Sequence, residues 1–583
     1  MGSLGVTISR ERPAFVPKGL MRRIRSWPLL LLGGWILQVG IRLALAIYQR
    51  VPILIPDESG YLLAARLLTG GAAGNLSGRT FYQAGYPLLI SPAFWLSSDP
   101  ATVYRLVILI NSLVGASIFA LAYIALRRLD LPRGQAYLLA TVTALLPSQI
   151  YYGQFAMTDA VLPVAVLGWL LLVHAWIASG RLGYGVAASL VAAYTYCVHA
   201  RGEVIVLVHA GLLAAALWRR WARRRDIAVI ANVLVAGSAG AWALNGWVRS
   251  QIYPGGVQAH GEWLLNRLTS LDGLGWTLGL AAGKIWYLIV STWGVAGVGL
   301  AAVGILAVRR RAPDATRATA YLTLAAVAGI ALATSAATAD EGTVANFAYG
   351  RYLSCLAPVL FLTGAVFATR CTRRTAVWAL LATAGLALVT AGIVRLHAGY
   401  RLSTHFFGTA DFPEICVLTW NWSTLQLGYA TWVALLLLTL AALIIASGGR
   451  DGLRIVAIGF IALDLAVMAV ATDRETRVWE ERVESATSLA PAGLRAHDHV
   501  GVNYVDLPWI IWVSQAFQAR NGLRAIDRYR RETLPPDVTL VVVPWNVGTP
   551  PRQSWPAAPS NWRPVSVRQT YAGDWVAWRR GVR

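Results

Sequence analysis

The chain has 583 residues, of which 56% are hydrophobic and 14% charged, and its mean hydropathy is +0.54. That much apolar surface exceeds what a soluble core can bury, so the composition excludes an ordinary soluble enzyme and predicts a polytopic membrane protein. The formal net charge of +23 does not indicate nucleic acid as a partner, because the arginines cluster between apolar segments, where the positive-inside rule places them.

The N-terminal residues 1–27 form a basic tail, and an apolar segment follows from Pro28 to Tyr48. The segment is long enough to span a bilayer, and its basic flank predicts a cytoplasmic N-terminus. A cleavable signal peptide is the alternative, with Ala44-Leu45-Ala46 as a weak cleavage site. The length of the segment and the many apolar segments after it favour a membrane anchor.

The first outer loop covers residues 49–100 and is predicted to hold two interfacial helices around a glycine-rich turn. Asp57 and Glu58 follow Pro56 and open the first of these helices, where the helix dipole favours negative charge. Carboxylates at a bilayer surface are costly to dehydrate, so this acidic pair is a site hypothesis. A simple helix cap is the alternative.

The remaining apolar segments alternate with loops, and every even-numbered segment ends in a basic loop. Such loops are cytoplasmic by the positive-inside rule. A thirteenth segment, at about 455–471, then places the C-terminus outside. The fold class predicted for residues 28–471 is therefore an α-helical polytopic membrane domain with about 13 transmembrane helices. The basic loops begin at Arg127, Arg181, Arg219, Arg309, Arg370 and Arg450.

The last segment, residues 472–583, is charged, mixed in composition and proline-rich. Val500–Val505 and Val538–Val543 have the pattern of strands, 508–519 that of an amphipathic helix, and 565–578 that of two more short strands. A small extracytoplasmic α/β domain is therefore predicted. The sequence of this domain shows no recognisable catalytic motif, so we interpret the domain as a lid or as a module that docks the acceptor.

The topology decides which polar residues share a compartment. Cations and acids at the outer ends of separate spans are what a membrane-surface site for an anionic ligand needs. Asp159 could equally be a helix-start residue, and Arg351 an interfacial anchor. Arg201 could simply pair with Glu203. The predicted outer side holds Asp57, Glu58, Asp159, His199, Arg201, Glu203, Lys284, Asp340, Glu341 and Arg351.

Lysine is rare in this chain: two of its 51 basic residues are Lys, and Lys284 is the one outside the N-terminal tail. It lies in the motif GKIWY, at the predicted outer start of the eighth span. A compact ammonium suits a phosphate as a point charge, where a guanidinium would impose its planar fork. Chance is the alternative. The cysteines and histidines show no ligand spacing, so no metal ligand and no disulfide framework is assigned.

In their order along the chain, several motifs resemble the GT-C class of integral-membrane glycosyltransferases. The similarity is greatest to the branch of the protein O-mannosyltransferases and the lipid A aminoarabinose transferases, and it covers about residues 28–360. The motifs that carry it are PDESGYLLAARLL, GYPLLISP, QFAMTDAVLPVAVLG, HARGEV, GKIWY and YGRYLSCLAP.

The resemblance implies transfer of a hexose or pentose from a polyprenyl-phosphate-linked donor to a glycan, lipid or protein acceptor. The transfer is inverting in most of these enzymes, takes place at the outer face and serves biogenesis of the cell envelope. In such a site Asp57 is the general base, and Glu58 and Asp159 bind the acceptor. Some members bind a divalent metal, so a metal cofactor stays open. Three cations match in kind those that hold the donor phosphate, namely Lys284, Arg201 and Arg351.

Two other function classes fit the same composition. A transporter or flippase of a polyprenyl-linked sugar would need the same cations without the chemistry, and a non-catalytic assembly subunit would need neither. Transporters often carry inverted repeats, and no convincing repeat is seen here. The large first outer loop with its acidic pair favours a transferase.

Overall fold

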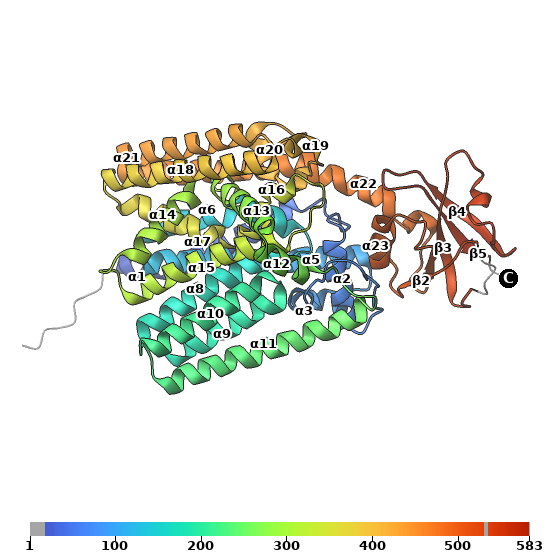
Figure 1. Ribbon diagram of the computed structural model, residues 1–583, viewed down its shortest axis with the longest axis horizontal. Helices are drawn as coiled ribbons and strands as arrows, with labels where there is room; N and C mark the ends of the chain where they lie inside the picture. Colours follow the sequence, from blue (N-terminus) through green and yellow to red (C-terminus); the bar gives the residue numbers. More distant parts are fainter. Residues whose placement is uncertain (1–17, 530–533, 582–583) are drawn as a thin grey trace, which may run out of the picture.

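The computed structural model describes residues 18–529 and 534–581. It consists of a long helical body with a five-stranded sheet at one end, formed by the last part of the chain (Figure 1). Among the described residues, ten helices are long and apolar enough to cross a membrane, and two apolar helices are shorter. The predicted fold class is confirmed, and the count of about 13 spans stays a prediction. Residues 1–17 of the predicted cytoplasmic tail lie outside the described part.

The helices of the body follow one another with short connections. In chain order they are α1 (Lys18–Leu45), α2 (Asp57–Leu68), α3 (Gly85–Ile90), α4 (Pro92–Leu96), α5 (Pro100–Arg128), α6 (Arg133–Leu145), α7 (Pro147–Tyr151), α8 (Leu162–Ser179), α9 (Leu182–Val198), α10 (Arg201–Trp218), α11 (Arg224–Ile252), α12 (His260–Thr269), α13 (Leu271–Val290), α14 (Val295–Val308), α15 (Asp314–Ala337), α16 (Ala345–Ala348), α17 (Ala357–Arg370), α18 (Arg373–Ala398), α19 (Arg401–Thr404), α20 (Pro413–Thr419) and α21 (Leu427–Ala471).

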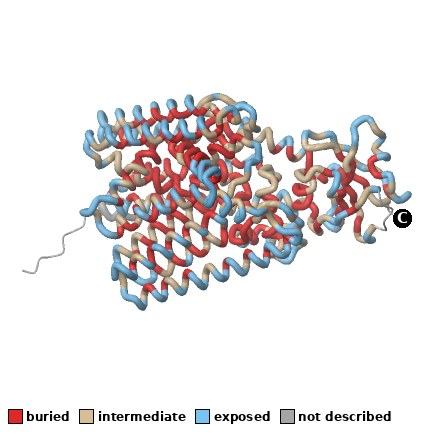
Figure 2. Tube along the Cα trace, in the orientation of Figure 1, coloured by how far each residue is buried: buried red, intermediate tan, exposed pale blue. Residues whose placement is uncertain are grey.

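Many residues on the outer faces of the helical body are exposed (Figure 2). Large apolar residues are among them. Leu29 on α1 is 69% exposed and Trp242 on α11 is 70% exposed. A soluble protein seldom exposes a large continuous apolar surface, whereas lipid chains cover it at no cost. The body is therefore that of a multi-pass membrane protein.

Helix α5 shows how the sequence sets the ends of a span. Pro100 occupies the first turn, where its missing N–H is no loss, and the Asp99 side chain accepts a hydrogen bond from the Thr102 amide at 2.9 Å. Arg127 and Arg128 close the helix, where cations complement the C-terminal dipole. The same two residues begin the first predicted basic loop after the N-terminus.

Helix α21 is broken at Gly449, whose φ of 53° and ψ of −118° are not helical. Glycine takes this conformation without the steric cost of a side chain. The segments that flank the two ends of α21 meet, because Thr409, shortly before α20, donates a hydrogen bond to Glu475, shortly after α21. The arms therefore form a hairpin with Arg450 at its tip, which agrees with two spans around a basic loop.

The helix that carries Lys284 differs from the predicted eighth span. It begins at Leu271, so Lys284 lies in the second half of α13 and not at a helix start. The glycines before Lys284 lie inside the helix, where they allow another segment to pack closely. A Cβ at Gly283 would lie 1.7 Å from the Phe347 carbonyl oxygen. The chain instead breaks after α13, where Trp293 has a positive φ of 56°.

The C-terminal segment forms a mixed sheet with strand order β2-β1-β3-β5-β4. Strands β1, β2 and β3 run parallel, and β5 is antiparallel to both β3 and β4. The strands and the helix predicted here are confirmed, and β2 was missed because three residues are too few for a periodic pattern. The elements are α22 (Arg477–Thr487), β1 (His499–Val502), α23 (Trp509–Gln518), β2 (Leu523–Ala525), β3 (Val538–Pro544), β4 (Trp562–Arg568) and β5 (Trp575–Arg580).

The membrane orientation can be tested with single cysteines in a background where the four native cysteines are replaced. Ser77→Cys in the first outer loop and Val547→Cys after β3 are expected to react with a membrane-impermeant maleimide in intact cells. Arg223→Cys is expected to react only after permeabilisation, which also serves as the control for all three sites. Labelling of Arg223→Cys in intact cells would contradict the predicted orientation.

Candidate active site

Four charged side chains from distant parts of the chain form one ion-pair cluster. Asp159 accepts from Arg201 Nη2 at 3.2 Å and from Arg351 Nε at 2.9 Å. Arg351 Nη1 also donates to Asp57 Oδ2 at 2.8 Å. Asp57 and Arg201 are the first residues of α2 and α10, whereas Asp159 and Arg351 lie on short 3₁₀ turns before α8 and α17.

Solvent exposure changes steeply across the cluster. The side chains of Asp159 and Arg201 are 1% exposed, that of Arg351 is 9% exposed, and that of Asp57 is 30% exposed. Asp57 is therefore the member of the cluster that a ligand from the solvent can reach most easily. Its second oxygen, Oδ1, accepts a hydrogen bond from the Tyr82 hydroxyl at 2.7 Å, which fixes the orientation of the carboxylate.

The two acids and two arginines of the cluster balance one another in charge. Protein acceptors occupy both terminal nitrogens of Arg201. Besides the bond from Nη2 to Asp159, Nη1 donates to the carbonyl oxygens of Arg351 and Tyr352 at 3.1 and 3.3 Å. His199 Nδ1 accepts from the Arg201 amide at 3.1 Å. Burial, and then the charge of Arg201, hold the pKa of His199 well below its usual value, so this ring is a neutral acceptor.

Lys284 lies beside the cluster without joining it. Its Nζ donates to Ser335 Oγ at 2.8 Å, and the residue is 1% exposed. Lys284 Nζ lies 5.0 Å from the centroid of the Tyr352 ring, and the Arg201 guanidinium lies 5.7 Å from the same centroid. No carboxylate of the described residues lies within ion-pair distance of Lys284. A buried ammonium without a counter-ion is costly, and an anionic ligand would remove that cost.

Glu58 does not face the cluster, contrary to its predicted contact with an acceptor. Oε1 accepts from the amides of Ile53 and Leu54 at 2.8 Å, and Oε2 accepts from the Ala156 amide at 2.7 Å and from the Tyr104 hydroxyl. The four bonds use both oxygens fully. Burial raises the pKa of Glu58 and these bonds oppose the rise. Glu58 thus ties the start of the first outer loop to the segment that carries Asp159.

Four further groups lie near the cluster: Tyr82, Tyr349 and Asp411 were not predicted as candidates from the sequence, whereas Glu341 was placed on the predicted outer side. Tyr82 contacts Asp57, and the Tyr349 hydroxyl accepts from Arg351 Nη1 at 3.0 Å. Burial raises the pKa of Asp411 to about 7, and the charge of Arg351 opposes the rise. Burial and the charge of Asp57 likewise raise the pKa of Glu341. The available signal was that the predicted topology puts both acids in outer loops.

The described residues do not fit a metal centre. Among them no group of three or more His, Cys, Asp or Glu side chains is placed to hold a metal ion. The carboxylates of Asp57 and Asp159 instead pair with arginine donors, and Asp57 also accepts from Tyr82. No step of a reaction is therefore derived through a metal.

Glu414 on α20 gives a test of this buried electrostatic environment by pH. It is 0% exposed and accepts from the Tyr287 hydroxyl at 2.5 Å, and its other oxygen has no partner. Burial raises its pKa from 4.5 to about 7. Between these values the folded state binds more protons than the unfolded state, so stability falls as pH rises from 4.5 to 7.

Glu414→Gln removes this titration and keeps an acceptor for Tyr287. At pH 8 the variant is expected to be more stable than the wild type by up to about 3 kcal/mol, and at pH 4.5 the difference is expected to vanish. Melting temperatures in detergent across this range measure the effect, with the exposed Glu262→Gln as the matched control. An equal difference at both pH values would contradict the raised pKa.

No family model matches the chain, and no curated protein sequence matches it. Several solved structures are similar to the chain in fold. ArnT from Cupriavidus metallidurans bound to undecaprenyl phosphate is 16% identical, with a TM-score of 0.51, and the match covers 95% of this chain and 98% of that one. The apo form of the same protein is 15% identical, with the same TM-score and coverage. The arabinosyltransferase EmbB from Mycobacterium smegmatis is 12% identical over 95% of this chain and 48% of its own, with a TM-score of 0.44.

The similarity to ArnT extends over nearly the whole of both chains. At this level of identity it establishes the fold. The expected resemblance to GT-C glycosyltransferases is therefore confirmed for the architecture, in which the helical body and the small C-terminal sheet occur together.

Proposed function

We propose that this protein is a glycosyltransferase that moves a sugar from a polyprenyl-phosphate-linked donor to an acceptor hydroxyl at the outer face of the membrane. The observation that carries the proposal is the ion-pair cluster: one of its carboxylates, Asp57, is partly open to solvent, and the Tyr352 ring at its edge also contacts a buried lysine that has no acidic partner among the described residues. ArnT, whose fold this chain shares, has been seen with undecaprenyl phosphate bound. That ligand has the chemistry of the donor proposed here.

Asp57 is the general base in this proposal. As the acceptor oxygen attacks C1 of the sugar, the hydroxyl proton passes to Asp57, and the bond from C1 to the phosphate oxygen breaks. Attack opposite the leaving group inverts C1. A general base must lie within hydrogen-bond reach of its proton, and Asp57 is the exposed acid of the cluster. Tyr82 and Arg351 hold it in one orientation from two sides.

Lys284 is proposed to bind the phosphate that leaves with the polyprenyl chain. Negative charge grows on that phosphate as the bond to C1 breaks, and fixed cations that meet growing charge are commonly the largest contribution to catalysis. Arg351 is the second candidate, since its guanidinium borders Asp57 and is 9% exposed. Arg201 is fully engaged by protein acceptors, so we assign it, with Asp159, to positioning Arg351.

The direct test is turnover of a synthetic short-chain polyprenyl phosphate that carries either arabinose or mannose. Purified protein is expected to release polyprenyl phosphate and to form a new glycoside, both measured by mass spectrometry. Lipid that copurifies with the protein, analysed in the same way, identifies the donor class. Movement of the intact donor across a proteoliposome membrane, with no cleavage at C1, would instead establish the flippase alternative.

A further inference from the structure

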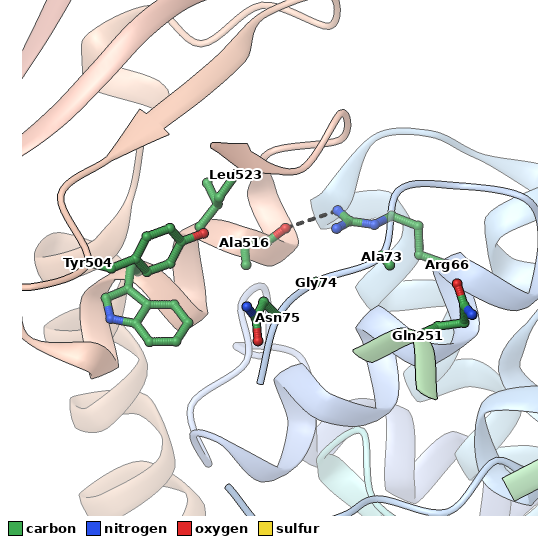
Figure 3. A pocket seen from close by; sticks show the side chains of 9 residues that line it. Arg66, Ala73, Gly74, Asn75, Gln251, Tyr504, Ala516 and Leu523 are labelled. Carbon is green, nitrogen blue, oxygen red and sulfur yellow. Dashed lines mark hydrogen bonds between the residues drawn. The ribbon is translucent and has the colours of Figure 1, made fainter. Parts of the chain in front are cut away.

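A cavity lies at the joint between the first predicted outer loop and the C-terminal sheet (Figure 3). Its volume is about 200 Å³. The loop after α2, the end of α11 and the helix α23 with its flanking segments all contribute to its wall. The residues that line it are Arg66, Ala73, Gly74, Asn75, Gln251, Tyr504, Trp512, Ala516 and Leu523.

Arg66, in the wall of this cavity, has one guanidinium nitrogen without a hydrogen-bond partner among the described residues. Its Nη1 donates to the Ala516 carbonyl at 3.0 Å, near the end of α23 (Figure 3). Nη1 also donates to the Ala519 carbonyl at 3.0 Å, and Nε donates to the Ala72 carbonyl at 2.9 Å. The residue is only 7% exposed, and its Nη2 is buried without a hydrogen-bond partner in the part of the chain that the structure describes. A buried polar donor without a partner is costly, and a ligand oxygen would satisfy it.

The rest of the wall combines aromatic rings with amides. The rings of Tyr504 and Trp512 meet edge to face with centroids 4.9 Å apart, and both residues are half-buried. Across the cavity stand the side-chain amides of Asn75 and Gln251, both on exposed residues (Figure 3). Pockets for drug-sized ligands measure about 300–1,000 Å³. This smaller cavity is therefore suited to a single ring.

We propose that this cavity is a sugar-binding subsite that holds part of the acceptor away from the reaction centre. A sugar ring presents C–H groups on its faces, which suit Tyr504 and Trp512, and hydroxyls at its edge, which suit Arg66 Nη2 and the two amides. One guanidinium, two amides and two aromatic rings match a sugar better than a purely apolar ligand.

Helix α2 connects this subsite to the proposed base. Asp57 is its first residue and Arg66 lies in its last turn, so the two are about 13 Å apart along the axis at about 1.5 Å per residue. The subsite rests on the proposed function for its role: an acceptor that reaches both ends of α2 must be longer than one sugar. The transferase would then prefer an oligosaccharide or glycan acceptor over a monosaccharide.

Sugar binding can be measured without turnover. The probes are the methyl glycosides of glucose, galactose, mannose and arabinose, added to the full-length protein in nanodiscs and followed by saturation-transfer NMR. Wild-type protein is expected to transfer saturation to at least one of them. Gln251→Ala is expected to weaken that binding roughly two- to tenfold, the usual contribution of one hydrogen bond. Asn266→Ala, which removes an exposed side-chain amide outside the cavity wall, is the matched control.

Ala73→Trp provides a second variant that removes no hydrogen bond and fills the cavity with an indole. It is expected to abolish glycoside binding while the melting temperature stays within a few degrees of the wild type. Binding that persists in Ala73→Trp, or no binding of any glycoside to the wild type, would overturn the subsite. Wild-type protein that binds glycosides here but never cleaves the donor would overturn the proposed function and leave the sugar site standing.

Discussion

Asp57→Asn is expected to lower the rate of sugar transfer by roughly a hundredfold to ten-thousandfold, the range typical for loss of a general base. Asparagine has almost the same shape and can still accept from Tyr82, but it cannot take the proton of the acceptor hydroxyl. Donor binding is expected to survive, because the change removes no group assigned to the phosphate. Turnover at saturating donor and a separate binding measurement distinguish the two quantities.

The control for this variant is Glu262→Gln, which removes an exposed acid from the start of α12, outside the ion-pair cluster. It is expected to leave both turnover and melting temperature unchanged. Asp57→Asn also weakens one ion pair of Arg351, so its melting temperature is measured alongside its rate. A variant that binds donor poorly yet turns over normally at saturation would show that Asp57 binds the donor and is not the base.

Lys284→Met is expected to reduce turnover by roughly a hundredfold to a thousandfold, comparable to the loss of one preorganised donor that meets growing charge. Methionine keeps most of the volume of the lysine stem, so packing around α13 changes little. An interaction that strengthens in the transition state affects the rate constant as well as affinity. Both are therefore expected to fall.

Lys284→Arg separates this role from a structural one. The guanidinium keeps the charge but is larger and directional, so only part of the activity is expected to return. A structural anchor predicts the opposite pattern, with full activity in Lys284→Arg and a lower melting temperature but normal turnover in Lys284→Met. Full turnover of folded Lys284→Met would remove this residue from the site.

The ion-pair cluster was partly within reach of sequence reasoning. Loop charges placed Asp57, Asp159, Arg201 and Arg351 on the same side of the membrane, and the structure brings all four into contact. The sequence offered Glu203 as the partner of Arg201, but the observed partner is Asp159, 42 residues earlier. The side of the membrane on which a residue lies can be predicted from the charges of the loops. Which residues form ion pairs depends on how the helices pack.

Glu58 shows a different limit. Successive residues of an α-helix point about 100° apart, because a turn holds about 3.6 residues, so two adjacent acids at a helix start seldom face one cavity. Glu58 turns inward to backbone amides while Asp57 stays exposed. Tyr82 could not be told from an ordinary interfacial aromatic, since tyrosine is frequent at membrane surfaces for other reasons.

The contacts of Arg66 Nη1 cannot be predicted from a local sequence pattern, because its partners Ala516 and Ala519 lie 450 and 453 residues further along the chain. They are also backbone carbonyls and not side chains. Any sequence that keeps α23 helical presents the same oxygens at its last turn. Substitutions in α23 that preserve the helix therefore leave these acceptors in place, whereas a substitution of Arg66 removes the donor from the joint between the C-terminal segment and the helix that carries Asp57.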